Sequence, residues 1–282
     1  MSCYTSQSYS IKHENENFEI TLIEIDRLVL HEEIVPEMLK TLISKIRKDQ
    51  RQISPVIVDK ETLVVLDGMH RVEALRKFGC RFVGVCLVDY MSESIRIERW
   101  CRTVSERFDP IFLSEKTGLR FLQVNIETPM ENQLFLSLYD SKYLVQLSKE
   151  DIQLAFEAVR RLETCLKDMR KQINYEAERQ ALEKLETGSI FAIIYPPKIG
   201  KKQVLESAMN GRLFIPKATR HIFPARVIEA SIPLTLLQNK DLSVQKANKI
   251  FLETIKNKKL KQLQPGTVVN GRVYEEYLYM LE

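Results

Sequence analysis

Residues 67–71, Asp-Gly-Met-His-Arg, constrain the fold of this chain more than any other stretch. They follow an apolar run at 63–66 and precede a helical pattern that ends near Gly79. This order predicts a buried strand, a glycine turn and a helix whose first backbone N–H groups have no partners within the helix. Such a helix start favours an anion such as phosphate. The acid, the histidine and the arginine add a base, a proton donor and a bidentate phosphate clamp.

The same five residues also fit an ordinary strand-to-helix turn in which Asp67 caps the helix, so both interpretations stay open on this string alone. The chain contains neither a GxxxxGK[ST] string nor a GxGxxG string. A Walker loop, a dinucleotide-binding fold and a protein-kinase lobe are therefore not indicated.

The bulk composition is that of an ordinary globular protein, with 282 residues, 44% hydrophobic and 28% charged. No window approaches the roughly 20 apolar residues of a membrane span, and the N-terminus lacks a secretory signal pattern, so we expect a cytoplasmic protein. A net charge of +4 is weak support for nucleic-acid binding. The five cysteines show no zinc spacing.

Hydrophobic periodicity predicts an α+β fold. We expect a flexible N-terminus over 1–17 and a first domain over 18–108. Its strands are expected at 18–25, 56–58, 63–66 and 82–88, and its helices at 37–46 and 70–78. A second domain, helical and α/β, is expected over 109–240, with two helices in 151–186, a strand at 189–195 and a helix at 203–210. A basic amphipathic helix over 243–263 and a tail complete the C-terminal segment 241–282.

Two further strings carry chemistry. Glu32, in the string His31-Glu32-Glu33, precedes a helix and is a candidate general base, although this string alone favours a solvated acid at a helix start. Lys217, Thr219, Arg220 and His221 lie between two prolines and suit a carboxylate or a phosphate. Trp100, the single tryptophan, is a candidate pocket wall or a plain core residue.

Taken in order, these strings resemble those of the free L-serine kinases of the ParB/sulfiredoxin superfamily, which include an archaeal ADP-dependent enzyme and a bacterial enzyme of siderophore synthesis. The resemblance rests on His31-Glu32, on residues 67–71, on Trp100 and on residues 216–221, and it spans about 18–235. It implies a ParB/sulfiredoxin-like N-terminal domain with a small mixed sheet, and a C-terminal α/β domain that closes the active-site cleft.

The resemblance also implies a reaction. The terminal phosphate of ATP or ADP would pass, with Mg²⁺, to the hydroxyl of L-serine and give O-phospho-L-serine. Glu32 would be the general base, and Asp67 would assist catalysis and contact Mg²⁺. Gly68, Met69, His70 and Arg71 would hold the nucleotide phosphates. The substrate would meet the residues Trp100, Lys217, Thr219, Arg220 and His221.

Met69 stands where the archaeal kinases tend to have a second histidine, which puts one phosphate contact in doubt. Sulfiredoxins have a reactive cysteine at that position, and a thioether cannot replace it. The alternative function is a nucleotide-binding DNA regulator of ParB type that uses the basic C-terminal helix. The balanced charge and the string at 217–221 favour the enzyme, with serine and nucleotide as partners and no membrane.

Overall fold

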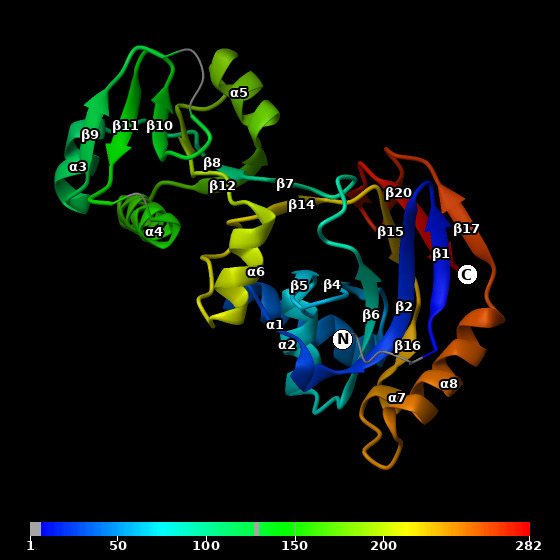
Figure 1. Ribbon diagram of the computed structural model, residues 1–282. Helices are drawn as coiled ribbons and strands as arrows, with labels where there is room; N and C mark the ends of the chain where they lie inside the picture. Colours follow the sequence, from blue (N-terminus) through cyan, green and yellow to red (C-terminus); the bar gives the residue numbers. More distant parts are fainter. Residues whose placement is uncertain (1–6, 127–129, 150) are drawn as a thin grey trace. The chain divides into compact units, whose positions relative to one another are not determined.

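The chain folds as two units whose sequences interleave. The computed structural model describes residues 7–126, 130–149 and 151–282. The first unit comprises Met1–Arg96, Leu205–Leu213 and His221–Glu282, and the second comprises Ile97–Val204 and Phe214–Arg220. The architecture is mixed α/β, with small sheets and eight α-helices among the described residues (Figure 1).

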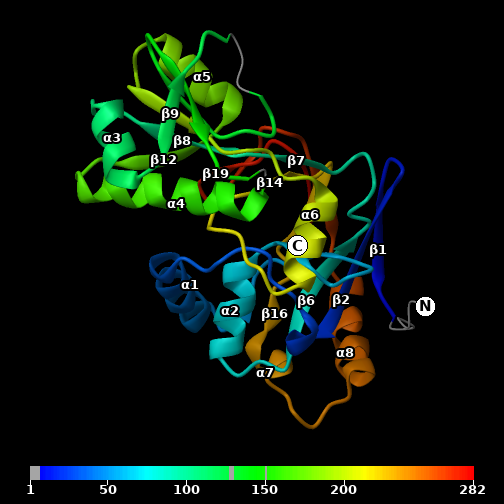
Figure 2. The same cartoon turned by 60° about the vertical axis from the view of Figure 1, so that its left-hand side comes forward.

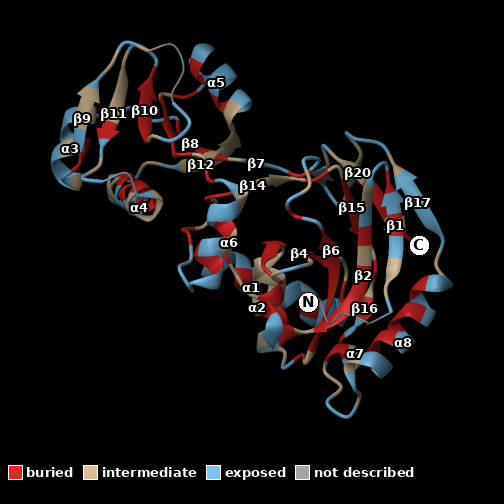
Figure 3. Ribbon diagram, viewed as in Figure 1, coloured by how far each residue is buried: buried red, intermediate tan, exposed pale blue. Residues whose placement is uncertain are grey.

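The first unit is built on a mixed five-stranded sheet. Strands β2, β6 and β4 form its centre, and β4 runs parallel to β6 whereas the other neighbours are antiparallel. The inner strands β4 and β6 are buried along their whole length because both of their sequences are almost wholly apolar (Figure 3). In sheet order the strands are β1 (Tyr9–His13), β2 (Glu16–Glu24), β6 (Phe82–Val88), β4 (Val56–Asp59) and β5 (Val65–Asp67).

Helices α1 (Pro36–Asp49) and α2 (Met69–Lys77) lie side by side in this unit (Figure 2). Pro36 starts α1, where a missing N–H costs nothing. Gly68 caps α2 with a φ of +97°, and Gly79 follows the helix with a φ of +68°. The predicted strand, glycine turn and helix are therefore present, and a short 3₁₀ helix (Ile25–Arg27) follows β2.

Both ends of the chain contain strands where the sequence predicted a flexible N-terminus and a C-terminal helix with a tail. Residues 9–13 form β1, which pairs with β2 because a turn at 14–15 lets two polar-apolar segments meet. Residues 1–6 of the expected flexible terminus lie outside the described residues. The basic helix is shorter than expected: α8 covers Val244–Lys256, and 260–263 form strand β17 instead. Helix α8 packs on β2, where Asn248 accepts a hydrogen bond from the backbone N–H of Leu22 at 2.6 Å.

The C-terminal tail is part of the first unit. Strand β20 is the middle strand of a three-stranded sheet, parallel to β15 and antiparallel to β17. The remaining elements of this part are α7 (Leu234–Leu237), β3 (Arg51–Gln52) paired with β16 (Ile232–Pro233), and a hairpin of β18 (Val268–Val269) and β19 (Arg272–Val273). The three-stranded sheet consists of β15 (Ala225–Ile228), β20 (Tyr277–Leu281) and β17 (Leu260–Leu263).

The second unit is an antiparallel six-stranded sheet with three helices (Figure 1). The expected pair of helices in 151–186 is present, but strand β12 separates them, because 173–177 pair with β8. In sheet order the strands are β12 (Ile173–Ala177), β8 (Trp100–Val104), β13 (Ala192–Tyr195), β10 (Phe135–Leu138), β11 (Lys142–Gln146) and β9 (Arg120–Gln123). The helices are α3 (Pro110–Thr117), α4 (Ile152–Asp168) and α5 (Glu178–Glu186).

Three elements carry the chain across the unit boundaries: β7 (Arg96–Glu98), α6 (Lys201–Met209) and β14 (Arg220–Ile222). The expected boundary near residue 108 thus falls inside the second unit, and the expected C-terminal segment 241–282 packs within the first. Over the described ranges, the structure holds no helix with the length and apolarity to cross a bilayer.

Candidate functional site

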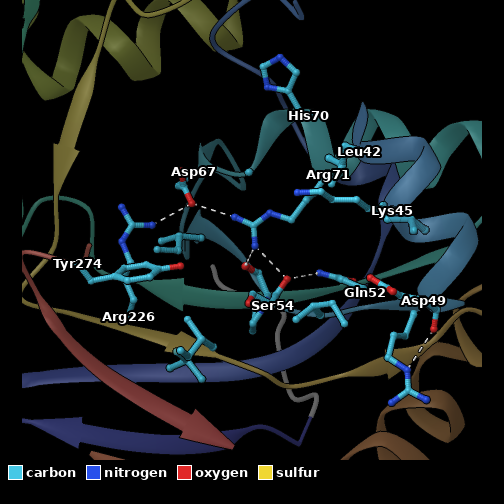
Figure 4. A pocket seen from close by; sticks show the side chains of 18 residues that line it. Leu42, Lys45, Asp49, Gln52, Ser54, Asp67, His70, Arg71, Arg226 and Tyr274 are labelled. Carbon is cyan, nitrogen blue, oxygen red and sulfur yellow. Dashed lines mark hydrogen bonds and ion pairs between the residues drawn. The ribbon is translucent and has the colours of Figure 1, made fainter. Parts of the chain in front are cut away.

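Asp67 stands at the end of β5, and its carboxylate accepts hydrogen bonds from two arginines. The Oδ2 atom lies 2.9 Å from Nη2 of Arg71 and 2.9 Å from Nη1 of Arg226 (Figure 4). Arg71 comes from the first turn of α2, whereas Arg226 comes from β15, 159 residues after Asp67. Because two guanidinium groups meet at one carboxylate oxygen, this arrangement suits Asp67 to positioning the two arginines.

Arg71 is held in one orientation by the backbone around it. Its Nη1 atom donates to the carbonyl oxygens of Ser54 at 3.0 Å and Pro55 at 2.6 Å. A Cβ atom at position 68 would lie 2.8 Å from Nη2 of Arg71, and the positive φ of Gly68 disfavours any other residue there. Gly68 therefore serves both the turn and the close approach of the guanidinium.

Arg226 is a site residue that the sequence analysis missed. Its side chain is almost fully buried, and its Nε atom donates to Oε1 of Glu276. Burial alone would lower the pKa of Arg226, but the charges of Asp67 and Glu276 outweigh it and raise that pKa above its usual value. A single arginine in the otherwise apolar strand 225–228 is the signal that could have revealed it.

A cavity of about 420 Å³ opens beside these residues within the first unit (Figure 4). One part of its lining is charged or polar, and another part is an apolar wall. The charged and polar part includes Asp67, Gly68, His70, Arg71, Arg226, Gln52 and Ser54. The apolar wall includes Leu42, Ile46, Ile53, Pro55, Ile57, Val227 and Ile228, and Tyr274 completes the lining near Arg226.

His70 lies in the lining of this cavity, whereas Met69 does not. His70 lines it, and its Nε2 atom accepts a hydrogen bond from the backbone N–H of Val35 at 3.0 Å. This bond requires an unprotonated Nε2, so His70 presents the proton on Nδ1. Met69 is half-buried at the start of α2 and is not among the residues that line the cavity.

Glu32 and His31 form a buried acid–imidazole pair in the same unit. Oε1 of Glu32 lies 3.8 Å from Nε2 of His31, and both side chains are at least nine-tenths buried. Nδ1 of His31 lies 2.7 Å from the carbonyl oxygen of Val65, to which it donates its proton. Burial lowers the pKa of His31, although the charges of Glu32 and Asp67 act in the opposite direction. His31 is therefore neutral near pH 7, and both carboxylates lie within its electrostatic reach.

His221 contacts His31 of this pair and also Tyr90. Its ring lies edge-on to His31, with ring centroids 5.4 Å apart, and its Nε2 atom shares a hydrogen bond of 2.8 Å with the hydroxyl of Tyr90. Burial raises the pKa of Tyr90, so the hydroxyl keeps its proton. The string at 217–221 is divided, because Lys217, Thr219 and Arg220 belong to the second unit and His221 to the first.

In the second unit, two cationic side chains, Lys217 and Arg220, contact the indole ring of Trp100. Nζ of Lys217 lies 5.2 Å from the ring centroid, and the guanidinium carbon of Arg220 lies 5.4 Å from it. Nη1 of Arg220 also donates to Glu98 at 2.5 Å. We call Trp100, Lys217, Arg220 and Glu98 the Trp100 cluster, and we call Asp67, Gly68, Arg71, Arg226 and Glu276 the Asp67 cluster. Thr219, which lies between Lys217 and Arg220 in the sequence, is buried.

A buried ion pair holds the loop that carries Lys217. Arg102 is fully buried, and its Nε atom donates to Glu163 at 2.7 Å. The two Nη atoms of Arg102 donate to the carbonyl oxygens of Lys217 at 3.0 Å and Pro216 at 3.3 Å. Lys217 has a φ of +62°, a conformation that non-glycine residues rarely adopt. The loop is therefore fixed by a guanidinium that solvent does not reach.

The described residues contain no group of three or more histidine, cysteine, aspartate or glutamate side chains arranged to hold a metal ion. A magnesium ion in such a site would depend on one or two carboxylates together with oxygens of a phosphorylated ligand. Two carboxylates of the described residues line the cavity, Asp67 and Asp49, and Asp67 is the one beside the start of α2.

No model of a known protein family matches the sequence. The chain is similar to an ATP-dependent L-serine kinase of Desulfurococcus mucosus, with 24% identity over 233 residues, which are 78% of this chain and 91% of the relative. It is also similar to an ADP-dependent L-serine kinase of Thermococcus kodakarensis, with 23% identity over 73% of this chain and 88% of the relative.

Two solved structures share the fold. A glutamate-to-glutamine variant of a free serine kinase in complex with AMP superposes with a TM-score of 0.68 and 18% identity, over 83% of this chain and 98% of its own. SbnI with a C-terminal truncation, from Staphylococcus aureus, gives a TM-score of 0.69 and 19% identity, over 83% of this chain and 95% of its own. These likenesses extend over most of both units.

Proposed function

We propose that this chain is a free L-serine kinase of the ParB/sulfiredoxin-like superfamily, which transfers the terminal phosphate of ATP or ADP to the hydroxyl of L-serine and yields O-phospho-L-serine. The observation that carries the proposal is the pair of arginines, Arg71 and Arg226, beside Asp67 at the start of a helix and on the wall of a cavity. Relatives that match 73–79% of the chain include three L-serine kinases, two of them ATP-dependent and one ADP-dependent.

The nucleotide binds in the cavity of about 420 Å³ in the first unit. Phosphates take the charged end of the cavity, beside the start of α2, where Arg71 and Arg226 supply positive charge. The nucleoside packs on the apolar wall. Gly68 and His70 line the phosphate end. Met69 lies off the cavity lining, so the proposal assigns it no direct phosphate contact.

Glu32 is the general base. It takes the proton from the serine hydroxyl while that oxygen forms a bond to the terminal phosphorus, and the bond from phosphorus to the leaving ADP or AMP breaks. A buried carboxylate suits this role because few water molecules compete for the proton. Neutral His31 beside it leaves the negative charge of Glu32 uncompensated by an imidazolium.

Asp67 orients the two arginines and is the candidate magnesium contact. Magnesium bound with the nucleotide would neutralise phosphate charge, and this is the chemistry that such a site requires. Arg71 and Arg226 also neutralise phosphate charge. Phosphoryl transfer depends mainly on such electrostatic stabilisation and on the positioning of the reacting groups.

The Trp100 cluster holds the amino acid. Lys217 and Arg220 present two cations at one aromatic ring, an arrangement that suits the carboxylate of serine or the phosphate of the product. Thr219 supplies a hydroxyl from the same segment, and His221 acts from the first unit beside His31.

A DNA-binding regulator is the weaker candidate. Between residues 105 and 187 the helices α3, α4 and α5 are separated by strands, which is not the order of a helix-turn-helix.

The test is to incubate the purified protein with L-serine and Mg²⁺, with either ATP or ADP, and to measure O-phosphoserine by mass spectrometry. We expect product with at least one nucleotide and none without serine. A Glu32→Gln preparation purified in the same way controls for contaminating kinases. Absence of O-phosphoserine with both nucleotides would overturn the proposal.

A further inference from the structure

The C-terminal segment, 266–281, is integral to the first unit. Strand β20 lies between β15 and β17, and Leu278 and Leu281 are buried. The parallel register with β15 pairs Ala225 with Tyr277 and Arg226 with Leu278. This register places Glu276 next to Arg226.

Glu276 holds one edge of the Arg226 guanidinium. It accepts a hydrogen bond from Nε of Arg226, while Nη1 of the same group donates to Asp67 at 2.9 Å. Two carboxylates at two different edges fix the plane of the guanidinium, because its donors lie in a rigid fork. Arg226 therefore depends on the C-terminal segment for its orientation beside Asp67.

Tyr274 reaches the same cavity from the hairpin that precedes β20. Its backbone N–H donates to the carbonyl oxygen of Thr267 at 3.1 Å, and its own carbonyl oxygen accepts from the N–H of Gly266 at 2.7 Å. The side chain of Asn270, at the tip of the hairpin, donates to Glu229 at 3.4 Å. The ring of Tyr274 lies beside Arg226 in the cavity lining (Figure 4).

We infer that the C-terminal segment is a working part of the nucleotide pocket: Glu276 is a positioning residue that aims Arg226 at the nucleotide phosphates, and the ring of Tyr274 packs against the nucleoside. This inference rests on the proposed function for the identity of the ligand. In this inference Glu276 acts indirectly, through Arg226, whereas the ring of Tyr274 contacts the ligand directly.

The test is calorimetric titration of the full-length protein with AMP and with ADP, in the absence of serine. We expect Glu276→Gln, which keeps the shape of the side chain, to weaken ADP about tenfold and AMP less, because ADP brings more negative charge to the guanidinium. Tyr274→Ala should weaken AMP and ADP equally, by about tenfold, and Tyr274→Phe should bind both like the wild type.

Glu275→Gln is the matched control, since Glu275 is the exposed neighbour of Glu276. Wild-type ADP affinity in Glu276→Gln would overturn the positioning role, and so would an equal loss for AMP and ADP together with a lower melting temperature. Wild-type affinities in Tyr274→Ala would overturn the direct contact. Because binding is measured without serine, these outcomes are independent of whether the chain phosphorylates serine. A wild-type protein that binds neither nucleotide would instead refute the proposed function itself.

Discussion

The Asp67 cluster and the Trp100 cluster both gather two cations, but they restrain them by different means. Arg71 and Arg226 share one carboxylate oxygen, each at 2.9 Å. Lys217 and Arg220 instead lie over one indole ring, at 5.2 and 5.4 Å from its centroid. An ion pair fixes a guanidinium tightly and in one plane, whereas an aromatic face attracts cations over a broad area.

The difference matches two kinds of ligand. A chain of phosphates needs cations at fixed positions, because the charge that develops during transfer is localised on a few oxygens. A small amino acid needs a surface that admits it and then releases a product with a different charge. If the clusters divide the work in this way, variants of one should change the response to nucleotide and variants of the other the response to serine.

The largest effect is expected from Glu32, which belongs to neither cluster. Glu32→Gln removes the base and should lower kcat by roughly 10²- to 10⁴-fold. Affinity for AMP, measured by calorimetry, should stay within about threefold of the wild type because the phosphate-binding groups are unchanged. Near-normal turnover in this variant would show that another group accepts the proton.

Arg71→Gln should come next, with a nucleotide affinity about 10- to 100-fold weaker, since it removes a charge-assisted contact at the phosphate end. The KM for serine should change little. Lys77→Gln, an exposed change at the end of the same helix, is the control. Steady-state kinetics with each substrate varied in turn provide the measurement, and an equal rise in both KM values would contradict the division of work.

Arg220→Gln tests whether the Trp100 cluster affects serine binding and leaves nucleotide binding unchanged. We expect the KM for serine to rise about tenfold, the size of one charge-assisted hydrogen bond, with unchanged affinity for AMP. Arg179→Gln, at an exposed position of the second unit, is the matched control. Loss of AMP affinity in Arg220→Gln would place this residue with the nucleotide instead.

The smallest expected effect is a change in how folding stability depends on pH, and it involves His31. The folded chain disfavours protonated His31, because burial lowers its pKa, whereas the unfolded chain protonates it near pH 6.5. The contribution of His31 to stability is therefore fully present above pH 6.5 and falls as the pH drops below that value. Thermal melts from pH 7.5 to 5.0 should fall less steeply for His31→Gln than for the wild type, and parallel curves would refute this assignment.

The local part of the site could be predicted from the sequence. The apolar run, Gly68 and the helical pattern after it predict the turn correctly, because the backbone conformation there is decided by neighbouring residues. The contacts of Arg226 with Asp67 and Glu276 could not be predicted, because they depend on the parallel pairing of β15 with β20, which no local pattern reveals. The split of Arg220 from His221 has the same origin, since a unit boundary passes between two adjacent residues.

The central place of β20 also bears on the order in which the units fold. The strand covers Tyr277–Leu281 and pairs on both sides, with β15 and with β17. Its sheet, which carries Arg226, can therefore close only after residues 277–281 have been synthesised. All residues of the second unit are synthesised by Arg220, well before β20. Because synthesis runs from the N-terminus, the second unit is expected to fold first, although the first unit begins earlier in the sequence.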